Sequence, residues 1–277
     1  MNEIEDKKIR LHKKTNFKLE DLLDIMEILR SPQGCAWDRK QNHDSIKPNL
    51  IEEAYEVIDA IEAKDSEMMT EELGDLLLQV IFHSQMAKEG GSFTIDDVIN
   101  NICRKLISRH THIFGEEQEE LANSEEVLLL WEKNKAKEKN LATKAQDLKN
   151  VPRSFPALLR AYKIQKRAAS VGFDWDCVED VRAKLLEEIE ELDGATSRSE
   201  QEEEMGDLLF AAVNLARFMK IDPELALSKS NDKFIHRFEK MEELILKEKK
   251  DFKDLDLEGM DGFWDKVKED ERKNKKA

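Results

Sequence analysis

The sequence predicts an all-α protein built from two tandem copies of one four-helix domain. The 277 residues include only 10 Gly and 5 Pro, which is few for sheets joined by tight turns. Apolar residues recur at spacings of three and four, and no segment shows the alternation that is typical of a strand. One ordered set of motifs also occurs twice, which indicates a duplicated domain.

The composition excludes some classes of molecule as binding partners of this chain. The chain has 45 Lys and Arg against 61 Asp and Glu, a formal net charge of −16, so nucleic acid and anionic membranes are poor partners. Because 40% of the residues are apolar, a core can form although 38% are charged. No apolar run is long enough to span a membrane. Cys35, Cys103 and Cys177 form no CxxC pair, which favours reduced thiols in the cytoplasm.

The first copy is expected to follow a flexible N-terminal arm, residues 1–16. Apolar spacing indicates a helix after Phe17, which the segment Ser31-Pro32-Gln33-Gly34 ends. Pro48 suits the first turn of the next helix, and Thr94 with Asp97 forms a capping box. The four helices expected in this copy cover residues 17–30, 48–63, 66–88 and 94–109.

The second copy repeats this order after a charged segment that is poor in large apolar residues. We interpret residues 134–152 as a linker between domains at 17–133 and 153–270, with one more exposed helix as the alternative. Residues 271–277 are expected to be a tail. The four helices expected in the second copy cover residues 157–169, 181–192, 200–219 and 223–247.

The duplication is clearest where acidic residues meet apolar ones. The segment Glu-Glu-Leu-Gly-Asp-Leu-Leu at residues 71–77 matches Glu-Glu-Met-Gly-Asp-Leu-Leu at residues 203–209. Upstream, Leu-Ile-Glu-Glu-Ala-Tyr-Glu at residues 50–56 matches Leu-Leu-Glu-Glu-Ile-Glu-Glu at residues 185–191. Downstream, each copy has a Lys and an Arg four positions apart, and then a Trp; these residues are Lys105, Arg109 and Trp131, and Lys233, Arg237 and Trp264.

The acidic motifs predict a metal site. Glu188 and Glu191 share one helix face, as do Glu204 and Asp207 on the next helix. If these helices pack antiparallel, four carboxylates converge, and a hard divalent cation compensates for their repulsion. Mg²⁺ suits oxygen ligands and phosphate, and the absence of His from the motif disfavours iron. The alternative is a solvated acidic face, which the adjoining apolar residues and the duplication disfavour.

On these motifs the chain resembles the MazG family of nucleoside triphosphate pyrophosphohydrolases, in its tandem two-domain form. The family signature Glu-Glu-x-x-Glu followed by Glu-x-x-Asp occurs twice, and the segments GCAWDRKQ and PALLRAYKIQKRAASVGFDW are also similar. The resemblance covers about residues 17–268. It implies hydrolysis of ribo- and deoxyribonucleoside triphosphates of broad base range to monophosphate and pyrophosphate, with Mg²⁺ or Mn²⁺, by a homodimer.

Each site residue is carried over at the matching position. The expected catalytic residues are Glu187, Glu188, Glu191, Glu204 and Asp207, of which the last four would bind the metal. Nucleotide contacts are assigned to Lys184, Glu187, Glu203, Lys233, Arg237 and Trp264. A second site would comprise Glu52, Glu53, Glu56, Glu72, Asp75, Lys105 and Arg109.

The two copies differ at one informative position. Lys184 stands one helical turn before Glu187, whereas Asn49 stands at the corresponding place before Glu52. A cation there can contact the triphosphate that the carboxylates hold through metal, so the second copy is the better equipped. The first copy is then a weaker site, a site for another ligand, or a structural and regulatory copy.

Three alternatives to this function remain at the level of sequence. One is a metal–nucleotide binding module without turnover, in which the fold is kept for regulation. Another is an acidic helical scaffold without a ligand. The third is a related all-α hydrolase with a narrow, dUTPase-like preference for uracil.

Overall fold

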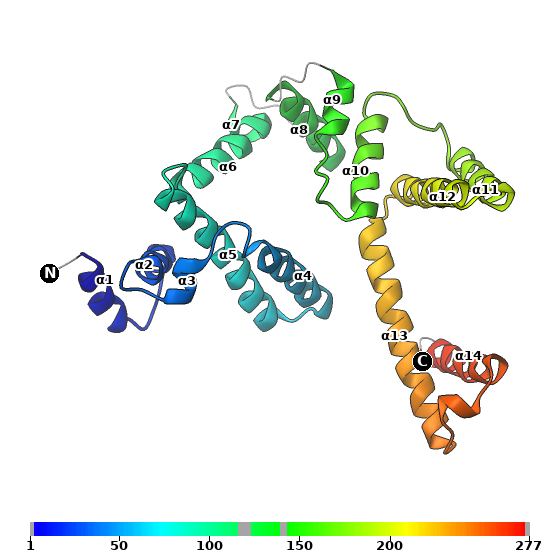
Figure 1. The fold of residues 1–277 in the computed structure, drawn as a ribbon. Helices are drawn as coiled ribbons and strands as arrows, with labels where there is room; N and C mark the ends of the chain where they lie inside the picture. The colour runs from blue at the N-terminus through cyan, green and yellow to red at the C-terminus, as the bar shows by residue number, and fades with distance from the viewer. Residues whose placement is uncertain (1–2, 116–122, 139–142, 275–277) are drawn as a thin grey trace. The chain divides into compact units, whose positions relative to one another are not determined.

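The computed structural model describes residues 3–115, 123–138 and 143–274 and divides the chain into two units, Met1–Lys139 and Asn140–Ala277. All regular structure in the described ranges is helical (Figure 1). The predicted all-α fold is therefore confirmed. Within the described ranges, no helix is both long enough and apolar enough to cross a bilayer.

Unit 1 contains the four predicted helices of the first copy. They are α2 (Leu19–Arg30), α4 (Lys47–Ala63), α5 (Ser66–Glu89) and α6 (Ile95–Arg109). The short helix α3 (Ala36–Lys40) lies between α2 and α4, α7 (Thr111–Phe114) follows α6, and α8 (Ser124–Glu138) packs on α6. The predicted capping box at Thr94 is present, with Asp97 accepting from the Thr94 backbone N–H.

The expected flexible arm instead contains a helix, α1 (Glu3–His12), that packs on α2. Its cations meet the acidic face of α2: the Lys7 ammonium lies 2.8 Å from an Asp24 oxygen, and Arg10 also binds Asp24. Lys14 binds the buried Asp21 carboxylate at 2.6 Å. Apolar spacing did not reveal this helix because charge pairs attach it.

Unit 2 contains the second copy as α10 (Ala157–Ala169), α11 (Val178–Gly194), α12 (Arg198–Phe218) and α13 (Pro223–Lys247). Helix α14 (Leu257–Asn274) packs on α13 and includes part of the expected tail, of which residues 275–277 lie outside the described ranges. Within the expected linker 134–152, α8 ends at Glu138, and α9 (Lys144–Lys149) packs on α10. Residues 139–142 of that linker are not described.

The main apolar clusters lie away from the acidic motifs. In unit 1, Met26 of α2 packs with Ile81, Phe82 and Met86 of α5 and with Ile46. In unit 2, Met241 and Ile245 of α13 pack with Phe263 and Val267 of α14. The acidic helix pairs, α4 with α5 and α11 with α12, leave large apolar side chains exposed, including Ile51, Tyr55, Leu73, Leu77, Leu186, Ile189, Met205 and Leu209.

Candidate active site

The second acidic cluster forms where α11 and α12 lie side by side (Figure 1). Glu188 and Glu191 come from α11, and Glu204 comes from α12. Each offers an oxygen atom, and these atoms all lie within 4.8 Å of one another. We call these three residues the second cluster. Oxygen donors alone are what Mg²⁺ and Mn²⁺ prefer, so the donor set fits the expected metals.

The electrostatics of this cluster indicate unbalanced negative charge. Loss of water contact is the main cause that raises the pKa of Glu204, and the charges of Glu191 and Asp207 raise it further. Asp207, one turn after Glu204, thus lies close enough to act on the cluster, although its own carboxylate is exposed. Glu203 also raises the pKa of Glu204 and is exposed.

Lys184 supplies a cation at the edge of the second cluster. Its ammonium lies 2.7 Å from a Glu187 oxygen and 2.9 Å from a Glu188 oxygen. Glu187 and Glu188 stand three and four positions after Lys184 on α11, about one turn away, which is why the lysine side chain reaches both carboxylates. These contacts raise the pKa of Lys184, so it stays charged. The Glu188 side chain is only 6% exposed.

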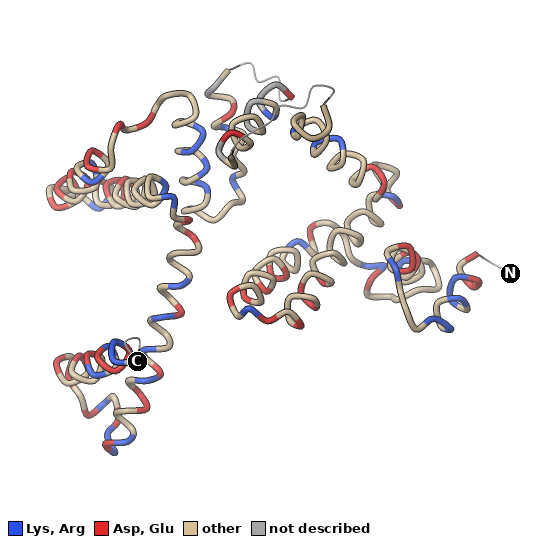
Figure 2. Tube along the Cα trace, turned by 180° about the vertical axis from the view of Figure 1, so that it is seen from behind, with Lys and Arg blue, Asp and Glu red and all other residues tan. Residues whose placement is uncertain are grey.

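The first copy forms an equivalent cluster from α4 and α5. Oxygen atoms of Glu53, Glu56 and Glu72 lie within 4.8 Å of one another, and we call these residues the first cluster. Burial raises the pKa of Glu53 most, and the Asp75 charge adds to it. The Gln79 side-chain amide donates to Glu53 at 3.5 Å. Glu52 lies exposed on α4, beside the cluster rather than in it. Figure 2 shows acidic residues along both helix pairs.

The structure does not bring the predicted basic and aromatic residues to the second cluster. Within the described ranges, no hydrogen bond or ion pair joins Lys233, Arg237 or Trp264 to it. Lys233 is exposed on α13. Arg237 donates to Glu271 of α14, at 2.8 Å for the shortest contact. The Trp264 ring lies 5.1 Å from the Phe234 ring and packs on the α13–α14 core.

Unit 1 repeats this arrangement of arginine and glutamate, which sequence reasoning missed. Arg109 donates to Glu138 at 2.9 Å and stacks on the Trp131 ring at 5.0 Å, while Lys105 is exposed. Glu138 and Glu271 each follow their tryptophan by seven positions. That shared spacing was the available signal. It identifies the carboxylates that hold the two arginines.

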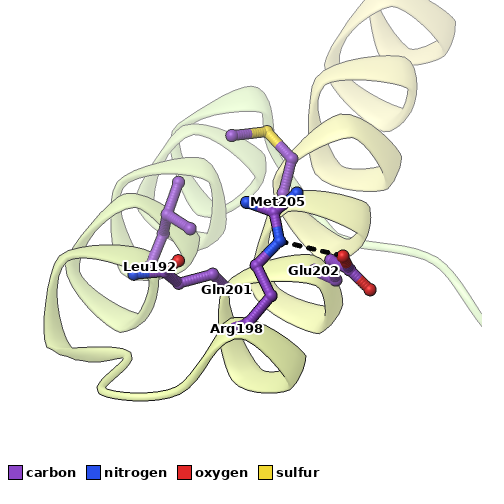
Figure 3. Close-up of a pocket in the computed structure, with 5 residues that line it drawn as sticks. All are labelled: Leu192, Arg198, Gln201, Glu202 and Met205. Atoms are coloured by element: carbon purple, nitrogen blue, oxygen red, sulfur yellow. Dashed lines mark hydrogen bonds and ion pairs between the residues drawn. The ribbon is translucent and has the colours of Figure 1, made fainter.

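A surface hollow lies near the second cluster but is separate from it. It is lined by Leu192 of α11 and by Arg198, Gln201, Glu202 and Met205 of α12 (Figure 3). Arg198 donates to Glu202 at 3.0 Å, within one helix. Since no carboxylate of the second cluster lines this hollow, it is not the metal site.

Two helical copies, each with a matched cluster of three glutamates, define a class of all-α proteins whose clusters suit a divalent cation. The family model described as the MazG nucleotide pyrophosphohydrolase domain matches residues 41–114 and 178–241, and so covers both clusters. The chain belongs to the MazG family. The expected family and enzyme class, nucleoside triphosphate pyrophosphohydrolase, are thereby confirmed.

Individual relatives match along most of the chain. A protein of Thermotoga maritima named nucleoside triphosphate pyrophosphohydrolase/pyrophosphatase MazG is 49% identical over 256 residues, 92% of this chain and 98% of its own length. The nucleoside triphosphate pyrophosphohydrolase of Escherichia coli K12 is 44% identical over 260 residues, with the same coverage. The uncharacterized protein YabN of Bacillus subtilis is 44% identical over 98% of this chain and 55% of its own length.

Proposed function

We propose that the second copy hydrolyses ribo- and deoxyribonucleoside triphosphates of broad base range to monophosphate and pyrophosphate, with Mg²⁺ or Mn²⁺. The relatives' names support triphosphate hydrolysis. The observation that carries the proposal is the convergence of Glu188, Glu191 and Glu204 within 4.8 Å, beside the charged Lys184. Anionic oxygens so close together favour a divalent cation, and the adjacent ammonium favours phosphate.

The carboxylates have distinct roles in this proposal. Glu188, Glu191, Glu204 and Asp207 would hold the metal, which when bound polarises the phosphate and acidifies a water molecule. Glu187 lies outside the second cluster, is exposed and pairs with Lys184, and its carboxylate would orient or deprotonate the attacking water when Lys184 turns to the triphosphate. Because the Glu188 side chain is only 6% exposed, bulk water would compete little with a metal for its carboxylate.

We propose a homodimer, because one chain leaves both the apolar surface and the nucleotide site incomplete. Leu186 is 61% exposed on α11 and Leu209 is 52% exposed on α12, next to the carboxylates in sequence. A second copy packed on these faces would bury them as in a helical bundle. It would also allow Lys233, Arg237 and Trp264 of either chain to meet the triphosphate and the base.

The first copy is proposed as a weaker or regulatory site, since its cluster has no lysine. The free cysteines Cys35, Cys103 and Cys177 support a cytoplasmic, reducing location. Base stacking on Trp264 would tolerate many bases, in keeping with a broad range.

Turnover with product identification tests the proposed function. The full chain is incubated with each common triphosphate and Mg²⁺, and the products are separated by anion-exchange chromatography. We expect monophosphate and pyrophosphate in equal amounts from several bases, loss of turnover in EDTA and recovery with excess Mg²⁺. Diphosphate and inorganic phosphate as products, or full turnover in EDTA, would refute the assignment. Turnover of dUTP alone would favour the narrower hydrolase.

A further inference from the structure

The two clusters differ in the partner of one carboxylate. In the second cluster, the Lys184 ammonium lies 2.9 Å from Glu188. In the first, among the residues described, no Lys or Arg forms an ion pair with Glu53, Glu56 or Glu72. Glu53 accepts a hydrogen bond from the neutral amide of Gln79, at 3.5 Å, and its carboxyl group also contacts that of Glu56. Asn49 stands where a lysine would be needed.

The Lys184 ammonium occupies a carboxylate, that of Glu188, which is also a proposed metal ligand. Glu188 is nearly buried, so its charge is poorly stabilised by water and depends on a nearby cation. An ammonium and a divalent cation near the same carboxylate repel each other. The metal therefore binds at the expense of the Lys184–Glu188 contact, unless Lys184 gains another anion.

We propose that Lys184 is a resident counter-ion of the second cluster. A metal that binds there displaces the Lys184 ammonium from Glu188, and the triphosphate then becomes the new partner of that ammonium. This inference rests on the proposed function. A triphosphate that arrives with its metal offers Lys184 new oxygen partners, so metal and nucleotide reinforce each other's binding. The second cluster thus favours the metal–nucleotide complex over free metal. The first cluster, which has no such lysine, binds free divalent cation more tightly.

The position of Lys184 on the helix suits this exchange. It is one turn from both Glu187 and Glu188, and its side chain is 35% exposed, so the ammonium can turn outward without unfolding α11. Arg182, two positions earlier, is more exposed and pairs with Glu179 instead. It provides a matched control for the loss of one positive charge from the same helix.

Binding of free Mn²⁺ in the absence of nucleotide, measured by electron paramagnetic resonance, tests the proposal. In a full-length background with Glu53→Gln and Glu72→Gln, only the second cluster reports. There we expect Lys184→Met to tighten Mn²⁺ binding about tenfold, because a charge beside a largely buried carboxylate is weakly screened. Arg182→Met should change it less than twofold. Unchanged or weaker Mn²⁺ binding in Lys184→Met would overturn the proposal.

The reverse substitution gives an independent measurement. In a background with Glu188→Gln and Glu204→Gln, Asn49→Lys should weaken Mn²⁺ binding to the first cluster about tenfold, for the same reason. An unchanged affinity would contradict the proposal even if Lys184→Met failed to fold.

A nucleotide arm separates the counter-ion role from a structural one. At saturating Mn²⁺, Lys184→Met should bind a triphosphate analogue with a methylene group in place of the α–β bridging oxygen more weakly than the parent does. The expected changes in metal and nucleotide affinity thus have opposite signs, whereas a structural defect weakens both. Absence of triphosphate turnover in the wild type would defeat the proposed function, while the Mn²⁺ measurements would still decide the role of Lys184.

Discussion

The Nδ1 atoms of His43 and His83 lie 2.8 Å apart in unit 1, and their rings are stacked with 5.1 Å between centroids. At this distance one nitrogen carries a proton and the other accepts it, so the pair cannot hold a proton on both Nδ1 atoms. The Nε2 atom of His83 is buried without a partner. Burial, and then the charge of His43, lower the pKa of His83. The charged group next to His43 is Asp44, which pairs with Lys47.

This pair predicts a loss of stability at mildly acidic pH. Because the pKa of His83 is lower in the folded chain, the unfolded chain binds more protons, and the free energy of unfolding falls as pH drops below about 6.5. When the matching motifs of α5 and α12 are aligned, Leu215 of the second copy stands at the position of His83 in the first. We expect His83→Leu to flatten the pH dependence of unit 1 unfolding between about pH 7 and 5. Calorimetry at a series of pH values measures the stability of unit 1 in the variant and in the parent.

The control for this experiment is His12→Leu, which removes an exposed histidine from the same unit. It should leave the pH dependence close to that of the parent. If His83→Leu and the parent lose stability equally on acidification, the histidine pair does not control the acid sensitivity of unit 1.

The charge of Glu204 should destabilise the metal-free protein at neutral pH. The pKa of Glu204 is raised in the folded chain, so the folded state holds the Glu204 proton more tightly than the unfolded state does. Protonation of Glu204 therefore stabilises the fold, and that contribution is lost as the pH rises through the raised pKa. We expect Glu204→Gln in EDTA to raise the melting temperature at pH 8 by a few degrees, and less at pH 5. Mg²⁺ should then stabilise the variant less than the parent.

Glu202→Gln is the matched control, because Glu202 lies on the same helix but pairs with Arg198. It should not raise the melting temperature in EDTA. An equal gain from both substitutions would mean that overall net charge, and not repulsion in the second cluster, is responsible.

The sequence predicted the eight main helices because their caps and apolar spacing are local signals. Thr94 with Asp97 marks the start of α6, and α10 spans the predicted residues, Ala157–Ala169. The carboxylates of Glu188 and Glu191 could be placed on one face from their spacing alone. Their approach to Glu204 was predicted on the assumption that α11 and α12 are antiparallel, and oxygens of these three residues lie within 4.8 Å of one another. Asp207, the fourth carboxylate expected there, does not belong to that group.

Other features depend on contacts between distant residues. His43 and His83 are far apart in sequence, and neither belongs to a motif, so nothing in the sequence predicts their contact. Helix α1 is held by Lys7 and Lys14 against α2, which periodicity cannot show. The pairing of Arg237 with Glu271 was also missed. The shared spacing from tryptophan to glutamate points to Glu271, but it does not show that α14 packs on α13 and so brings Glu271 to Arg237.

The exposed apolar residues of α11 and α12 predict self-association. Light scattering at micromolar concentration should give twice the 32.2 kDa chain mass. Leu209→Asp places a charge on the exposed face of α12 and should weaken the dimer at least tenfold, because a buried unpaired carboxylate costs at least about 1.4 kcal/mol. Gln201→Asp, on the same helix at an already polar position, should remain dimeric. A monomeric parent would refute the dimer.

The division of labour between the copies gives the last prediction. Glu188→Gln, Glu191→Gln and Asp207→Asn each remove a proposed metal ligand with little change in volume. We expect each to lower the rate of triphosphate hydrolysis about 100-fold or more, because the metal supplies most of the charge stabilisation in the transition state. Circular dichroism should show unchanged helix content, since the lost charge was repelled by its neighbours in the metal-free chain.

The matching substitutions in the first copy are Glu53→Gln and Asp75→Asn. They should cost far less activity, because Asn49 replaces the lysine that binds beside Glu188 in the second copy. Both sets are compared at saturating Mg²⁺ and equal protein concentration, so that a difference in metal occupancy does not account for a difference in rate. If the first-copy variants lose activity and the second-copy variants keep it, hydrolysis takes place at Glu53, Glu56, Glu72 and Asp75, and Lys184 does not mark the active copy.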